Sequence, residues 1–204
     1  MVHPIAVFGC TFWVISITKH KYKREGNGME EIKLMLPSIE YGEDIMLFKA
    51  EILEAKESDS FAGCYSLQLS ENAQQWVDSC KSMENIKTCP ENFVTSTTYM
   101  AVRTSDNLVV GIIELRHHIN HPILGTWGGH IGYSIRPSQR RKGYAKEMLR
   151  LCLQKCAERN MDKVMVTCST ENMASEKTII ANGGVYEKTV PGDGEMMKRY
   201  WIAV

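Results

Sequence analysis

The order of strand-like and helix-like segments predicts a mixed α/β fold, with a mostly antiparallel central sheet and helices on both faces. Two strand-like runs, Thr97–Arg103 and Leu108–Arg116, are joined by a three-residue polar stretch that predicts a hairpin turn. Strands then alternate with helices, and the chain closes on a second hairpin. Because antiparallel strands come first and strand–helix alternation follows, we expect one mixed sheet covered on both sides.

The segments before the first hairpin predict one strand and two helices. Ile32–Leu36 has the composition and length of a short strand. Ser38 is suited to cap a helix over Tyr41–Ala55, in which apolar residues recur at helical spacing. Ser70 is suited to cap a second helix around Trp76.

The segments after the first hairpin predict alternating strands and helices. A loop rich in histidine and glycine, His117–Gly129, leads into a strand over His130–Arg136. Tyr144–Arg159 is predicted to be a helix, because its apolar residues form a stripe that can pack on a sheet. The last predicted elements are a strand, a helix and two hairpin strands: Lys163–Cys168, Met173–Ala181, Val185–Val190 and Glu195–Ala203.

The composition is that of one globular domain in a reducing compartment. The chain has 204 residues, with 24 basic and 24 acidic side chains, which gives no reason to expect nucleic acid as the main partner. Its seven cysteines are odd in number and no pair has C-x-x-C spacing. We therefore expect seven reduced thiols in a cytoplasmic protein.

The first 28 residues differ from the rest. Ile5–Ile17 is an apolar run too short to span a bilayer as a helix, and the basic residues follow it rather than precede it, unlike in a secretory signal. We expect residues 1–28 to be an extension outside the fold and residues 29–204 to form the domain. The alternative is a segment that docks on a membrane surface or a partner.

The stretch Arg140-Arg141-Lys142-Gly143-Tyr144-Ala145 predicts a phosphate-binding loop. It lies between a strand and a helix, and a helix start offers unpartnered N–H groups and a positive dipole end. Gly143 removes a side chain where a pyrophosphate would approach, and Lys146 adds charge. The pattern is neither a dinucleotide fingerprint nor a Walker A loop. The alternative is a solvated basic turn.

This stretch resembles motif A of the GNAT superfamily of N-acetyltransferases, Gln/Arg-x-x-Gly-x-Gly/Ala, with Arg140, Gly143 and Ala145 at the marked positions. Downstream, 171–175 is similar to the family's Asn-x-x-Ser motif, and 182–184 falls where the family has a glycine turn. The resemblance covers Thr97 to the C-terminus. It implies a GNAT fold, acetyl-CoA as co-substrate, and transfer of the acetyl group to a primary amine by direct attack.

The resemblance also implies which residues hold acetyl-CoA. In the family, backbone groups of the central strand hold the pantetheine arm, and loop amides hold the pyrophosphate. The matching residues here are Tyr133, Ser134, Ile135 and Arg136 on the strand, Arg141, Lys142, Gly143, Tyr144, Ala145 and Lys146 in the loop, and Asn172 and Ser175 after the next strand. Asn172 is also suited to cap the following helix.

Two residues, Glu114 and His130, are candidates for the general base. The family often has a tyrosine as general acid seven positions after the Asn, and Ile179 stands there. Glu114 is one candidate base, because on an alternating strand it follows Leu108, Val110 and Ile112 along one face. The alternative for Glu114 is an ion pair with Arg116. His130 is a second candidate, since a histidine pKa suits base work near neutrality, and its alternative is a structural hydrogen bond.

The sequence also leaves other functions and partners open. No cysteine or carboxylate cluster completes a metal site with the histidines, so no metal is expected. Ile179 makes a catalytically inactive acyl-CoA-binding module the main alternative, and a cofactor-free interaction protein the second. The acceptor amine stays open, no membrane partner is expected, and the terminal hairpin offers an edge for a homodimer.

Overall fold

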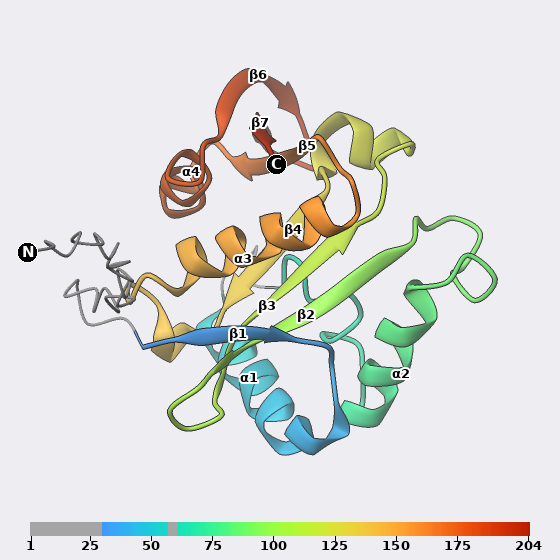
Figure 1. The fold of residues 1–204 in the computed structure, drawn as a ribbon, viewed down its shortest axis with the longest axis vertical. Helices are drawn as coiled ribbons and strands as arrows, with labels where there is room; N and C mark the ends of the chain where they lie inside the picture. Colours follow the sequence, from blue (N-terminus) through green and yellow to red (C-terminus); the bar gives the residue numbers. More distant parts are fainter. Residues whose placement is uncertain (1–29, 57–60) are drawn as a thin grey trace, which may run out of the picture.

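One seven-stranded sheet organises residues 30–56 and 61–204, which are the residues that the computed structural model describes (Figure 1). The strands are β1 Ile32–Met35, β2 Ser96–Arg103, β3 Val109–Arg116, β4 Ile131–Ile135, β5 Lys163–Ser169, β6 Val185–Pro191 and β7 Met196–Ala203. Their order is β1-β2-β3-β4-β5-β7-β6, and only the β4–β5 pair is parallel. The predicted mixed, mostly antiparallel sheet is confirmed.

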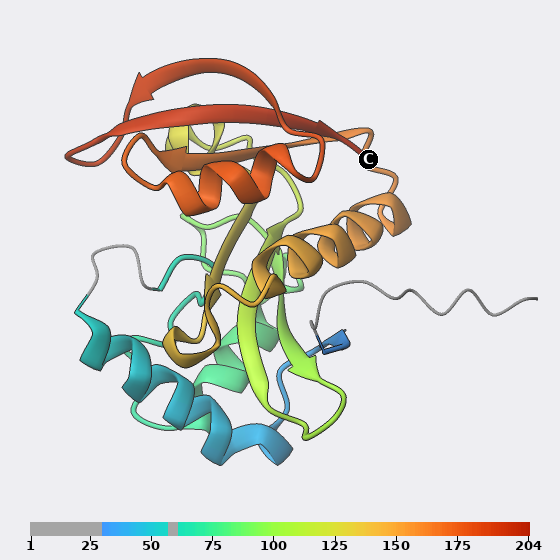
Figure 2. The ribbon, with the colours of Figure 1, turned by 90° about the vertical axis from the view of Figure 1, so that its left-hand side faces the viewer.

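Four helices cover the two faces of this sheet (Figures 1 and 2). On one face lie α1 Gly42–Ala55 and α2 Ala73–Met83, and on the other lie α3 Tyr144–Glu158 and α4 Met173–Ile180. Short helical turns are Ile39–Tyr41, Leu124–Gly128 and Pro137–Gln139. Each face has its own cluster of buried apolar side chains. No helix among these residues is both long enough and apolar enough to cross a membrane.

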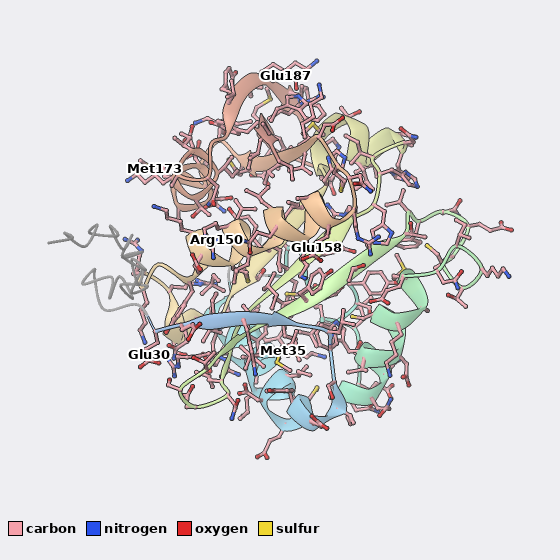
Figure 3. The ribbon with its side chains drawn as sticks, in the orientation of Figure 1. Glu30, Met35, Arg150, Glu158, Met173 and Glu187 are labelled. Carbon is pink, nitrogen blue, oxygen red and sulfur yellow. The ribbon has the colours of Figure 1, made fainter. Side chains whose placement is uncertain are left out.

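The predicted apolar stripe of α3 is buried against the sheet. Met148, Leu149 and Cys152 are completely inaccessible to solvent. On the opposite side of the helix, Arg150 and Glu158 point into solvent (Figure 3). The helix is therefore held by burial of one face, as the spacing of its apolar residues predicts.

Two of the predicted helix caps are corrected. Asn72, not Ser70, caps α2, because its side-chain oxygen accepts from the Gln75 amide, whereas the Ser70 hydroxyl donates to the Ser66 carbonyl. Ser38 caps a 3-10 turn that precedes α1 rather than α1 itself. The loop predicted over residues 117–129 also contains a helical turn, at residues 124–128.

A β-bulge in β3 changes which side chains share a face. The register with β2 shifts between Ala101 and Val102, so the pairing skips Val110. Val110 packs in the cluster beside α3, whereas Ile112 packs in the cluster beside α1 and α2. The expectation that Leu108 and Val110 share a face with Glu114 is therefore wrong, because Leu108 also packs against the cluster beside α3. Glu114 keeps the face of Ile112.

The two parallel strands of the sheet meet at a single register pair, Ile131 with Val166. Next to it, the His130 amide donates to the Met165 carbonyl at 2.7 Å, and the Met165 amide donates to His130 Nδ1 at 2.9 Å. Beyond this junction β4 and β5 run apart, and Figure 2 shows β5, β7 and β6 crossing above the other half of the sheet. We call the unpaired region between 132–135 of β4 and 167–169 of β5 the wedge.

The described cysteines are all free thiols: Cys64, Cys80, Cys89, Cys152, Cys156 and Cys168. This agrees with the expected reduced state for these six. Cys10 and the predicted extension 1–28 lie outside the described residues.

The buried junction histidine makes stability depend on pH. Burial lowers the pKa of His130 to about 4, whereas a histidine in an unfolded chain has a pKa of about 6.5. Between these values only the unfolded chain takes up the proton, so stability falls as the pH drops from about 6.5 toward 4. We expect the urea midpoint to fall between pH 7 and pH 5, and His130→Gln to make that fall smaller. The exposed His118→Gln should keep the parental fall, and an unchanged fall in His130→Gln would contradict the expectation.

Candidate functional site

The segment predicted to bind phosphate has the strand–loop–helix geometry that this role requires. β4 ends at Ile135, a short turn follows, and α3 begins at Tyr144. Arg141 and Gly143 have φ values of +64° and +89°, which turn the chain tightly into the helix. Gly143 is the N-cap and has no side chain to accept from the first-turn amides. These amides and the helix dipole therefore stay available to an anion.

The predicted loop residues differ in exposure. Solvent reaches Arg141, Lys142, Gly143 and Lys146 freely, whereas Ala145 is half-buried and Tyr144 is buried. The loop can thus offer three exposed cations, while Tyr144 can offer its backbone amide but not its ring.

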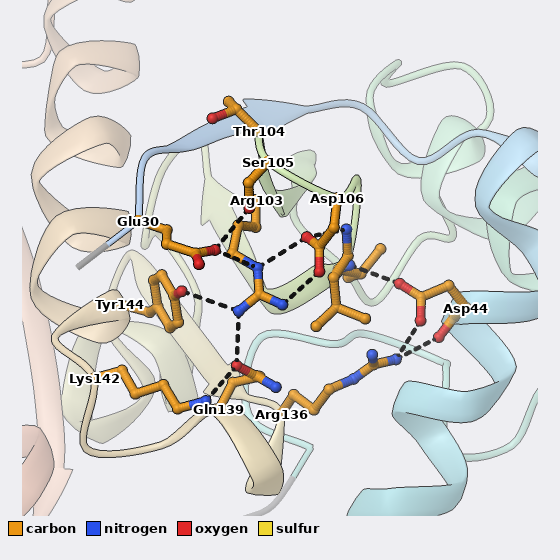
Figure 4. Close-up of polar contacts among 12 residues, drawn as sticks. Glu30, Asp44, Arg103, Thr104, Ser105, Asp106, Arg136, Gln139, Lys142 and Tyr144 are labelled. Atoms are coloured by element: carbon orange, nitrogen blue, oxygen red, sulfur yellow. Dashed lines mark hydrogen bonds and ion pairs between the residues drawn. The ribbon is translucent and has the colours of Figure 1, made fainter. Parts of the chain in front are cut away.

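Arg103, at the end of β2, contacts residues on both sides of this loop (Figure 4). Its Nη1 donates to Gln139 Oε1 at 3.1 Å and to the Tyr144 hydroxyl at 3.3 Å. Asp106 accepts from its Nε and Nη2, and Glu30 lies 2.9 Å from its Nε. The guanidinium lowers the pKa of Asp106 to about 2. This charged brace joins the β2–β3 turn to the residues that flank the loop.

The side chain of Arg136, a residue expected beside the cofactor-binding backbone of β4, points to α1. Its Nη2 donates to the Asp44 carbonyl at 2.8 Å and to Asp44 Oδ1 at 2.7 Å (Figure 4). The guanidinium also lies over the Phe48 ring, 5.8 Å from its centroid. Since this side chain is 3% exposed, it is available to join α1 to β4 and not to contact a ligand at the loop.

On the α4 side of β4, the structure brings together three residues predicted to contact the cofactor. The Tyr133 hydroxyl and Ser175 Oγ share a hydrogen bond of 2.8 Å. Asn172 Oδ1 accepts from the Ser175 amide at 3.0 Å, so Asn172 is the N-cap of α4, as its alternative reading expected. Tyr133 therefore links β4 to α4 beside the wedge.

The opposite face of β4 lies against the segment that precedes α2. Ser134 Oγ donates to the Ala62 carbonyl at 2.7 Å. Gly63, with φ of +72°, packs so closely that an added Cβ would lie 1.9 Å from the Gly132 carbonyl oxygen. Alternate β4 residues thus face different surroundings: Tyr133 faces α4, whereas Gly132 and Ser134 face this segment.

Glu114 is a buried, ion-paired carboxylate on the strand next to the wedge. It lies opposite Gly132 in the β3–β4 register and is 5% exposed. One oxygen accepts from the Ser96 hydroxyl at 2.8 Å, and the other lies 2.9 Å from Arg116 Nη2. The expected ion pair with Arg116 is present. A carboxylate has about four lone-pair positions, so each oxygen can still accept from a water or an amine.

His130, unlike Glu114, has no acceptor atom left for a water or an amine. Its Nδ1 accepts from the Met165 amide, which in the neutral ring leaves the proton on Nε2. The ring also packs edge-to-face with Trp201. With both nitrogens committed in this way and its pKa lowered to about 4 by burial, the geometry favours a structural role at the β4–β5 junction.

The two tyrosines of the terminal hairpin, Tyr186 and Tyr200, have hydrogen-bond partners of their own. The Tyr200 hydroxyl donates to Glu176 Oε1, and the Tyr186 hydroxyl shares a hydrogen bond with Thr189. Ile179 is fully buried in the core. These contacts place the Tyr200 hydroxyl against α4 and the Tyr186 hydroxyl within the terminal hairpin.

Among residues 30–56 and 61–204, no group of three His, Cys, Asp or Glu side chains is arranged to hold a metal ion. His117 instead lies between two threonines, with Nε2 2.9 Å from Thr97 Oγ1 and Nδ1 3.0 Å from Thr95 Oγ1.

Sequence reasoning missed the Arg103 brace, the Gly63–Gly132 contact and the reach of Tyr133 to α4. Each joins segments tens of residues apart, and a single sequence has no signal for such pairs. Only a positive-φ glycine at position 63 could have been suspected, from its place in a loop.

Comparisons with known proteins show which family this chain resembles. A family model described as an acetyltransferase (GNAT) domain matches residues 43–185. The uncharacterized N-acetyltransferase YnaD of Bacillus subtilis is 27% identical over 93 residues, which are 43% of this chain and 55% of that protein. The match thus spans about half the length of this relative.

Solved structures share the fold at low sequence identity. RimJ of Mycobacterium smegmatis, in complex with CoA-disulfide, has a TM-score of 0.61 at 14% identity and covers 87% of this chain and 86% of its own. The microcin C7 self immunity acetyltransferase MccE, in complex with acetyl-CoA and AMP, has a TM-score of 0.60 at 16% identity, covering 85% and 93%. A GNAT-family acetyltransferase of Bacillus anthracis has a TM-score of 0.59 at 17% identity, covering 87% and 97%. Because the family model matches more than half of its length, this chain belongs to the GNAT acetyltransferase family.

Proposed function

We propose that this chain is an acetyl-CoA-dependent N-acetyltransferase that moves the acetyl group to a primary amine. The observation that carries the proposal is that the anion-binding start of α3 follows directly on the part of β4 that is not paired with β5. An unpaired strand edge can pair with an extended amide chain such as pantetheine, while the loop amides and cations hold the pyrophosphate. Family membership supports this assignment.

The reaction proposed is direct attack in a ternary complex. The uncharged amine attacks the thioester carbon, the C–N bond forms and the C–S bond breaks, and the amine nitrogen loses a proton. A backbone amide of β4 stabilises the oxyanion. Of the two candidate bases, we keep Glu114, because its oxygens retain lone-pair positions for a water or the amine, whereas His130 has no free basic nitrogen.

Peptide amines are the acceptors to test first. One structure with the same fold, at 16% identity and a TM-score of 0.59, is the ribosomal L7/L12 alpha-N-protein acetyltransferase RimL. A panel of short peptides with free N-termini, with small amines beside them, can be screened by release of the CoA thiol. Binding of acetyl-CoA with no thiol release from any acceptor would instead favour an inactive acyl-CoA-binding module.

A charge placed in the α3 loop should abolish acetyl-CoA binding. Saturating acetyl-CoA, at about a hundred times its dissociation constant, should stabilise the parent by roughly 2.7 kcal/mol, seen as a rise in the thermal midpoint. We expect Gly143→Glu to lose this rise, because its side chain would repel the pyrophosphate. Gly194→Glu is the matched control: like Gly143, Gly194 has a positive φ, +78°, but it lies in the terminal hairpin, where nothing is within 4 Å of an added Cβ. A parent without the rise would overturn the proposed cofactor.

The Arg103 brace should tune affinity without touching the ligand. Arg103→Gln removes the charge-assisted bonds to Gln139 and Tyr144 that hold the loop, so we expect acetyl-CoA to bind about 10-fold more weakly, the equivalent of roughly 1.4 kcal/mol. Isothermal calorimetry measures this. Arg159→Gln makes the same charge change at the other end of α3, where Arg159 contacts Thr97, and should keep parental affinity. Equal weakening in both variants would point to net charge rather than to the brace.

Removing the proposed base should affect turnover and not cofactor binding. We expect Glu114→Gln to lower kcat about 100-fold or more, the usual contribution of a general base, with an unchanged acetyl-CoA midpoint shift. Glu176→Gln is the control, because Glu176 also pairs with a cation, Lys198, and accepts from a hydroxyl. Parental kcat in Glu114→Gln would leave this carboxylate a structural role alone.

A further inference from the structure

The Tyr133 side chain ends next to the place where β4 and β5 separate. Tyr133 is two residues beyond Ile131, the last β4 residue paired with β5, which is about 7 Å along the strand. From there its hydroxyl reaches the first turn of α4, 2.8 Å from Ser175 Oγ and 3.5 Å from the Ser175 carbonyl. The phenol therefore lies beside the wedge, close to its narrow end.

Ser175 is a fixed partner for this hydroxyl. Its amide donates to Asn172, the cap of α4, so the first turn that carries Ser175 is held in place. One turn later on the same helix side lies Ile179, which has no group to donate. Between β4 and α4, the hydroxyls of Tyr133 and Ser175 thus lie in contact beside the wedge.

The proposed reaction creates a charge that such a hydroxyl can stabilise. When the C–S bond breaks, the bonding electron pair leaves on sulfur, and a thiolate develops. A donor already in position lowers the energy of that charge without reorganisation. A cofactor whose pyrophosphate sits at the α3 loop and whose pantetheine follows β4 brings its sulfur toward the narrow end of the wedge.

We propose that the Tyr133 hydroxyl, held by Ser175, donates a hydrogen bond to the sulfur of acetyl-CoA as the C–S bond breaks. This inference rests on the acetyl transfer proposed above. The C–N bond forms as the C–S bond breaks, the amine proton leaves through the base, and the thiolate takes up a proton from solvent on release.

The acidity of the phenol agrees with donation rather than full proton transfer. Burial raises the pKa of Tyr133 to about 12, so the hydroxyl keeps its proton throughout the neutral range. A simple thiol has a pKa of about 8.5, so a thiolate is too weak a base to remove this proton completely. The contribution of Tyr133 should therefore not titrate between pH 6 and pH 9.

The test is Tyr133→Phe, which keeps the ring that packs on the core and removes only the hydroxyl. With acetyl-CoA and an acceptor that the parent uses, we expect kcat to fall about 10-fold to 100-fold, the range for loss of one hydrogen bond to a charged group. The acetyl-CoA midpoint shift should be retained, and the loss should be constant from pH 6 to pH 9. Tyr186→Phe, whose hydroxyl contacts Thr189 in the terminal hairpin, is the matched control with parental kcat.

A second substrate separates this effect from a structural one. The selenoester analogue of acetyl-CoA has a leaving group that needs less stabilisation, so the loss in Tyr133→Phe should shrink with it. Ser175→Ala keeps the phenol and removes its partner, and it should lower kcat by a smaller factor than Tyr133→Phe.

The outcomes are distinguishable. Parental kcat in Tyr133→Phe, or an equal loss with the thioester and the selenoester, overturns this inference and leaves the acetyl transfer standing. A parent that releases no CoA thiol with any acceptor overturns the proposed function, and this inference with it.

Discussion

The short pairing between β4 and β5 is the constraint on which the site depends. One register pair, Ile131 with Val166, is supported by the hydrogen bonds between His130 and Met165. Full pairing would give a continuous sheet in which β4 has no free edge. Because pairing stops, β4 keeps an edge available next to the loop, and α3 and α4 lie on the same face on either side of the separation (Figure 2).

Two arginines connect the loop region to the rest of the fold. Arg103 joins it to the β2–β3 turn, and Arg136 joins the end of β4 to α1 through Asp44, which also accepts from the Val109 amide. Buried or half-buried cations need such fixed partners, since an unpaired one is costly. The basic residues of this region therefore have two roles. The exposed Arg141 and Lys142 are available to a ligand. Arg103 and Arg136 hold the backbone that carries them.

The proposed leaving-group donor and the proposed base lie on opposite sides of the sheet. Tyr133 reaches α4 on the side of the α3 loop, where the cofactor is proposed to lie. Gly132 and Ser134 face the segment before α2, and Glu114 lies opposite Gly132 on β3. Strand alternation alone places the leaving-group donor and the base on opposite faces of the sheet. The thioester carbon, held at the unpaired edge between them, would be reached from one face while its sulfur departs toward the other.

The sequence by itself determined the elements whose signals are local. The polar turn between β2 and β3, the apolar stripe of α3 and the glycine at the α3 start each depend on neighbours a few residues away, and the structure has them where they were expected. The cap of α2 and the face of Val110 were misjudged, because a nearby Asn competed with Ser70 and a bulge broke the alternation. Tertiary structure alone decided that Arg136 turns to α1, that His130 closes the β4–β5 junction and that Tyr133 meets Ser175. These contacts join residues far apart in the chain, and their geometry exists only once both core clusters have packed against the two faces of the sheet.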